Sequence, residues 1–220
     1  MRAAVLMLAL VLITSCFVGG TFAKYVTSGN AGDYARVAKW GVTVDAHETG
    51  DVFAQSYDDT VISINDNKVV APGTKKENAT LVTLSGQPEV AVNVTYSAEH
   101  FRLDGKWASD DKGTFYCPLI ITVGDTVIKC AEKTSREAVA DAVKAAVAAC
   151  SARYEPKTNL STVEKGGLKI SWEWPFDETA NPGQSDEKDT YLGNQATKNA
   201  DPNILPSIYI PVTTTVTQID

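Results

Sequence analysis

The chain contains few of the residues from which metal sites and nucleophilic catalytic sites are usually built. Its 220 residues include two histidines, His47 and His100, and four cysteines. Neither histidine belongs to a His-Glu-x-x-His sequence, and no Gly-x-Ser-x-Gly sequence is present. We therefore expect a protein that is not an enzyme, with no catalytic residue, no metal ligand and no cofactor.

Basic residues are also scarce relative to acidic ones. The chain has 20 Lys and Arg against 27 Asp and Glu, a formal net charge of −7 at pH 7, and no run of three or more basic residues. Nucleic-acid binding usually needs a clustered basic surface to neutralise phosphates. We therefore expect no nucleic-acid partner.

The cysteines cannot form a dense disulfide framework. Cys16 lies in the apolar first segment, which leaves Cys117, Cys130 and Cys150. An odd number in an exported protein allows at most one internal bridge and one free thiol. A helix expected between Cys130 and Cys150 would separate them by roughly 25 Å, too far for a bridge. Pairing of Cys117 with Cys130 or with Cys150 stays open, and the leading expectation is buried or unpaired thiols without an essential bridge.

The first 23 residues have the pattern of a cleaved export signal. An apolar segment from Ala3 to Val18 is shorter than the roughly 20 residues that span a bilayer. The small residues Thr21 and Ala23 occupy positions −3 and −1 of a cleavage site between Ala23 and Lys24. This pattern predicts a secreted, extracellular or cell-surface protein with no stable membrane anchor after cleavage. A lipoprotein signal ending at Cys16 is the alternative.

The mature chain would begin with a polar arm, residues 24–34. Its centre is Ser-Gly-Asn-Ala-Gly, a sequence typical of flexible segments. An alternating pattern from Arg36 to Val44 then predicts the first core strand, with Trp40, Val42 and Val44 on its apolar face. We expect a single folded domain over residues 35–220.

Most of this domain reads as short strands separated by turn residues. Asn65–Asn67 and Gly124–Asp125 are the expected hairpin turns, and residues 71–74 form another turn. Alternation places Trp172 and Trp174 on one apolar face. The expected strands are 36–44, 61–64, 68–70, 80–85, 90–96, 115–123, 126–130, 168–174 and 208–219.

Two segments are expected to be helical. Residues 134–151 are rich in Ala and charged residues, and their apolar positions fall on one helical stripe, which predicts an inserted amphipathic helix capped by Thr134 or Ser135. Asp189–Thr190 could cap a short helix that ends at Lys198. Many strands with one inserted helix predict an all-β fold, a β-sandwich of jelly-roll or related Greek-key type.

Several motifs resemble those of the TasA/camelysin-like group of exported bacterial proteins, whose signals are cut by a SipW-type signal peptidase. The motifs are GGTFAKY at 19–25, ARVAKWGV at 35–42, VAPGT at 70–74, WEWPF at 172–176, DTYLG at 189–193 and the C-terminal strand 212–220. The resemblance implies a jelly-roll subunit of an extracellular fibre or biofilm matrix. It also implies self-association, with the arm residues Lys24, Tyr25, Val26 and Thr27 donating a strand to a neighbouring copy.

Two other functions stay open. A carbohydrate-binding β-sandwich would need an exposed strip of aromatic side chains, for which Trp107 is the candidate, since the other tryptophans are expected in the core. Some camelysin-like members are classed as metallopeptidases, and that function would need His47 and His100 to meet around a carboxylate.

Overall fold

The computed structural model describes residues 4–7, 35–47, 52–58, 60–64, 67–163, 166–176, 179–198 and 205–219. The chain divides into two units, Met1–Val37 and Ala38–Asp220. In the first unit, residues 4–7 are helical and exposed. The expected cleavage site, Ala23 and Lys24, lies outside the described residues, as do Tyr25, Val26 and Thr27.

The second unit is built mainly from antiparallel sheets, as an all-β sandwich requires. The largest sheet has five strands in the order β1-β4-β10-β7-β8, and a second has three strands in the order β12-β5-β9. Two short pairs, β11 with β6 and β2 with β3, complete the described strands. In chain order the strands are β1 (Val42–Ala46), β2 (Ser56–Tyr57), β3 (Val61–Ile62), β4 (Lys75–Gly86), β5 (Val92–Ser97), β6 (Arg102–Asp104), β7 (Ile120–Val123), β8 (Thr126–Lys129), β9 (Ala152–Tyr154), β10 (Gly167–Glu173), β11 (Ser207–Tyr209) and β12 (Thr213–Gln218).

One hydrophobic core is shared by the two larger sheets and a helix. Alternate residues of β10 and β5 point into it, as their sequence patterns predict: Leu168, Ile170, Trp172, Val92, Val94 and Tyr96 are all buried. Burial of a large aliphatic side chain contributes about 1.5–3 kcal/mol. The core therefore supplies the main stabilisation of the described fold.

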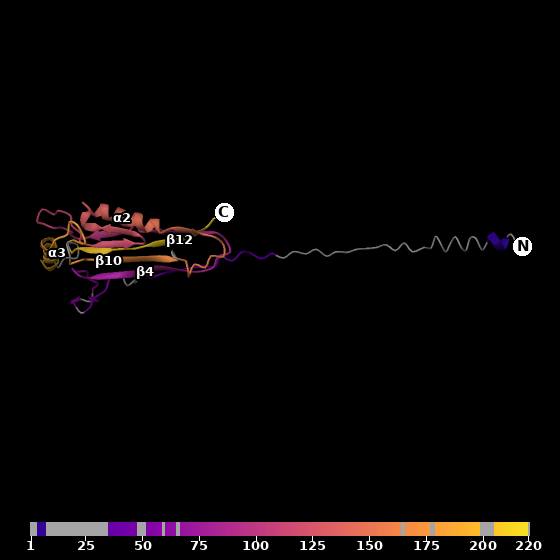
Figure 1. Ribbon diagram of the computed structural model, residues 1–220, viewed down its shortest axis with the longest axis horizontal. Coiled ribbons are helices and arrows are strands. Elements are labelled where there is room, and N and C mark those ends of the chain that lie inside the picture. The colour runs from indigo at the N-terminus through magenta and orange to yellow at the C-terminus, as the bar shows by residue number, and fades with distance from the viewer. Residues whose placement is uncertain are drawn as a thin grey trace. The chain divides into compact units, whose positions relative to one another are not determined.

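The predicted amphipathic helix is confirmed as α2 (Arg136–Ala149). The hydroxyl of Ser135 accepts a hydrogen bond from the amide of Ala138 at 3.1 Å, so Ser135 is the N-cap. Val139, Val143, Ala146 and Val147 are its buried residues. α2 contacts β5, β6, β7 and β8, and Figure 1 shows it lying alongside the strands. Two further helices are the 3-10 turn η1 (Cys130–Glu132) and α3 (Asp186–Lys198).

The first strand begins later than predicted. Residues 35–41 are not in a strand, and β1 starts at Val42. Gly41 has φ +60°, and a Cβ there would lie 2.5 Å from the backbone oxygen of Gln87. This left-handed residue interrupts the alternation. Trp40 is consequently 43 % exposed, and Val44 is exposed as well, which contradicts their expected place in the core.

Two other strand predictions are corrected. Val61–Ile62 pairs with Ser56–Tyr57, while Val69 bridges Ala54, so the hairpin expected between 61–64 and 68–70 does not form. The single last strand expected from 208 to 219 is divided into β11 and β12. Pro211 lies in the break, where its missing N–H cannot contribute to a ladder.

The remaining turns and helix are close to expectation. The Gly124–Asp125 hairpin joins β7 and β8, and the amide of Thr74 donates to the carbonyl of Ala71 at 3.0 Å in the predicted 71–74 turn. The last helix, however, starts three residues before the expected cap. Ser185 accepts from the amide of Lys188 at 3.4 Å, so Ser185 caps α3 and Asp189 lies inside it.

Candidate functional site

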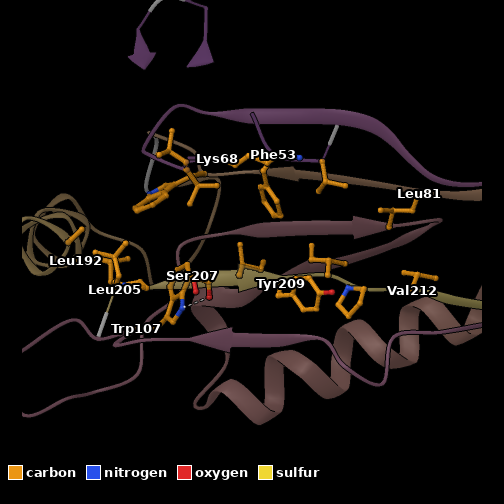
Figure 2. A pocket seen from close by; sticks show the side chains of 18 of the residues that line it. Phe53, Lys68, Leu81, Trp107, Leu192, Leu205, Ser207, Tyr209 and Val212 are labelled. Carbon is orange, nitrogen blue, oxygen red and sulfur yellow. Dashed lines mark hydrogen bonds between the residues drawn. The ribbon is translucent and has the colours of Figure 1, made fainter. Parts of the chain in front are cut away.

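An apolar groove of about 860 Å³ lies between the β1–β4 side of the five-stranded sheet and the segment 205–212. Figure 2 shows Phe53 and Leu81 on one side of it and Tyr209 and Val212 on the other. Concave sites lined mainly by apolar side chains, with a few polar groups, are typical binding sites. We therefore name this feature the β11 groove and treat it as the candidate site.

The β11 groove runs beside strand edges that lack a second partner. Eight consecutive residues, 205–212, line it. Among the described residues β11 pairs only with β6, and β1 and β12 each pair with one strand. Of these eight residues, Ser207–Tyr209 form the strand β11, and Pro206 and Pro211 on either side of it have no backbone N–H to donate. A short free strand edge beside an apolar groove is an arrangement that can accept an added strand.

One side chain fixes the position of this edge. The indole nitrogen of Trp107 donates to the backbone oxygen of Ser207 at 3.2 Å. Trp107 is only 3 % exposed, so the sequence-based expectation of an exposed aromatic is wrong. Trp172 and Trp174 are buried as predicted. No strip of exposed tryptophans is therefore present in the part of the chain that the structure describes.

Helix α3 forms one end of the groove. Leu192, Gly193 and Ala196 line this end, close to Leu205 (Figure 2). A Cβ added at Gly193 would meet no atom within 4 Å. Small residues at two positions one helical turn apart therefore leave open space at the end of the groove.

A buried carboxylate holds α3 against the core. Asp189 accepts hydrogen bonds from the Tyr116 hydroxyl, from Trp174 Nε1 at 3.1 Å and from Gln184 Nε2 at 2.9 Å. Burial, followed by the hydrogen bond to Asp189, raises the pKa of Tyr116 well above its usual range. Sequence analysis placed Asp189 at a helix cap and missed this role, because the donors Tyr116 and Trp174 are 73 and 15 positions away in the chain.

Polar side chains line the groove or contact residues that line it. The Nε2 atom of His47 is 3.2 Å from the hydroxyl oxygen of Thr83, and both His47 and Lys68 line the groove. The guanidinium of Arg102 lies 4.3 Å from the ring centre of Tyr209 and forms an ion pair with Asp104 at 2.6 Å. These side chains supply polar contacts around an apolar interior.

The structure brings none of the described residues into a metal-binding cluster. No group of three or more His, Cys, Asp or Glu residues close enough to hold an ion is found within the described ranges. His47 lies on the groove after β1, whereas His100 lies in the turn between β5 and β6. Among the described residues, no helix is long and apolar enough to cross a membrane.

Comparison with family models, with curated proteins and with solved structures found no match to this chain.

Proposed function

We propose that the mature chain is a secreted structural protein of the cell surface or of a biofilm matrix, whose copies assemble into fibres by strand addition. We further propose a jelly-roll or related Greek-key connectivity for its sheets. The signal-like first 23 residues support export. The observation that carries the assembly proposal is the β11 groove with its unpartnered strand edge.

Strand addition needs two things from the receiving subunit. Backbone groups along a sheet edge supply hydrogen bonds, and pockets beside that edge receive alternate side chains. The strand β11 (Ser207–Tyr209) supplies the edge, and side chains including Phe53, Leu81 and Leu192 supply apolar surface. The groove therefore offers both backbone pairing and side-chain burial to an extended segment.

The proposed occupant is the arm of a second copy, Lys24–Asp33. Its ten residues can extend over about 33 Å, which exceeds the roughly 10 Å of the three-residue strand β11. Tyr25 and Val26 are its large apolar side chains. Gly193 and Ala196 are exposed at the end of the groove, and no atom lies within 4 Å of a Cβ position at Gly193, so such a side chain could lie beside them.

Electron microscopy of the purified mature chain, with and without Lys24–Asp33, tests this function. We expect fibres only from the full mature chain, and unchanged circular dichroism after the deletion, because the first strand begins at Val42. Fibres from the shortened chain would refute strand donation by the arm. A full mature chain that stays monomeric across pH and concentration would indicate a surface protein that does not polymerise.

A substitution at the end of the groove can show whether fibres are lost because the groove is filled or because the protein unfolds. Gly193→Leu would place a branched side chain in the open space, while removal of a helical glycine favours α3 by up to about 1 kcal/mol. Gly193→Ala is the matched control, because it gives the same helix effect with far less volume. We expect the leucine variant to fold but to lose fibres, and the alanine variant to keep them.

A further inference from the structure

The segment that leads into β7 is held from three directions. The amide of Cys130 donates to the oxygen of Leu119 at 2.9 Å, and the Nδ2 atom of Asn181 donates to the oxygen of Pro118 at 2.7 Å. Tyr116 bonds to the buried carboxylate of Asp189. The position of Cys117 relative to Cys130 is therefore fixed by the bonds of its neighbours.

Cys117 and Cys130 are neighbours in the core, and both are free thiols in the structure, as the leading expectation from the sequence had it. Both residues are 0 % exposed, and the thiol of Cys130 donates to the backbone oxygen of Ile128 at 3.9 Å. The β7–β8 register, in which Ile120 pairs with Lys129, brings Cys130 opposite Leu119 and thus two residues from Cys117. Two buried cysteines this close in the register, on backbone held by hydrogen bonds, are placed so that a small adjustment could join them in a disulfide.

Cys150 is held at the opposite end of the same hairpin. Its sulfur lies 3.1 Å from the Cβ position of Gly124, which is in the turn between β7 and β8. Cys130 follows the last residue of β8, so the intervening extended chain spans about 20 Å. A bridge between Cys150 and either of the other two would exceed the distance a disulfide can span.

We propose that Cys117 and Cys130 are joined by a structural disulfide in the exported protein, with Cys150 left as a thiol. The proposal rests on the export part of the proposed function, because disulfides persist in oxidising surroundings. The oxidant is the disulfide of a thiol–disulfide exchange partner, such as oxidised glutathione or an oxidoreductase. One cysteine thiolate attacks that disulfide, which forms a mixed disulfide and releases one thiolate of the partner. The second cysteine thiolate then attacks the mixed disulfide, which forms the Cys117–Cys130 bond and releases the partner's other thiolate. Overall, two thiols lose two electrons and two protons, and the partner is reduced to two thiols.

The reaction must precede complete folding. Both sulfurs are buried, so the exchange partner cannot reach them in the folded chain. The hydrogen bond with Cys117, together with burial, also raises the pKa of the Cys130 thiol, which lowers its thiolate fraction. A bridge formed during folding is for the same reasons protected from reductants afterwards.

Thiol counting on the purified mature chain, residues 24–220, tests the bridge. The chain is refolded with oxidised and reduced glutathione, denatured without reductant, alkylated with N-ethylmaleimide and weighed by mass spectrometry. We expect one label on the wild-type chain, none on Cys150→Ser and two on Cys130→Ser. Three labels on the wild-type chain, or a peptide map with Cys150 in the bridge, would overturn the proposal.

A thermal measurement provides the second readout. Closing a loop of about 14 residues should raise Tm by roughly 6–12 °C relative to the reduced chain. This difference should disappear in the double variant Cys117→Ser, Cys130→Ser and persist in Cys150→Ser. Equal Tm values for the oxidised and reduced wild-type chains would contradict a structural bridge. N-terminal sequencing of the secreted protein tests export separately. A failure of the export proposal can therefore be distinguished from a failure of the disulfide proposal.

Discussion

Trp107 Nε1 donates a hydrogen bond to the backbone oxygen of Ser207, 100 positions further along the chain, at 3.2 Å. The bond ties the segment after β6 to the strand β11 that borders the groove. The contact is therefore tertiary, and both of its residues line the groove.

Replacing Trp107 by Phe should loosen the groove edge. The variant keeps most of the buried aromatic surface but leaves the oxygen of Ser207 without this donor, at a cost of about 1–2 kcal/mol in the free energy of unfolding. Chemical denaturation measures that loss. Fibre formation should weaken by more than the stability loss alone explains, which a comparison with an equally destabilised core variant would reveal. Unchanged stability would show that the bond contributes nothing.

Trp172→Ala should be among the most damaging core substitutions. Trp172 is 2 % exposed, its Nε1 donates to the oxygen of Val52 at 2.5 Å, and its ring lies 5.2 Å from that of Phe53. We expect a loss of about 3–5 kcal/mol in the free energy of unfolding. If the variant instead kept its Tm and lost binding to glycans, the carbohydrate-binding function would replace the structural one.

Stability should fall in alkaline solution through Tyr116. Burial and the bond to Asp189 raise its pKa above the ordinary value of 10.0. Above pH 10 the unfolded chain has therefore released a proton that the folded chain retains, and stability decreases by up to about 1.4 kcal/mol per pH unit for this group. Tyr96, whose pKa is also raised mainly by burial, acts in the same direction.

Denaturation of the wild-type chain and of Tyr116→Phe at pH 8 to 11.5 checks this effect. The variant should be less stable at neutral pH, because Asp189 loses a donor, but its stability should decrease less steeply above pH 10. Parallel curves for the two proteins would rule out Tyr116 as a source of the alkaline loss.

Features set by nearby residues were predictable from the sequence. The helix α2, its Ser135 cap, the buried face of β10 and the Gly124–Asp125 hairpin all depend on local periodicity and turn chemistry. Each of these was confirmed. By contrast, the start of β1 depends on Gly41, whose conformation is imposed by the close approach of Gln87.

The candidate site was less predictable because it also depends on contacts between residues far apart in the chain. Val61–Ile62 pairs with β2 instead of the following segment, and Trp107 is buried through its contact with Ser207. The groove edge at 205–212 exists because the last strand breaks near Pro211 and because β11 pairs only with β6 among the described residues. Pro211 is a local signal for the break, but the pairing of Val61–Ile62 with β2 and the contact of Trp107 with Ser207 have no local signal in the chain.

The most direct measurement of the central claim is binding of the arm to the groove. A fluorescent peptide of residues 24–33 is titrated into the chain that starts at Tyr34, and fluorescence anisotropy is recorded. We predict saturable binding that a scrambled peptide does not show, that Gly193→Ala preserves and that Gly193→Leu abolishes. Absence of binding, or equal binding to the Gly193→Leu chain, would contradict strand addition at the β11 groove.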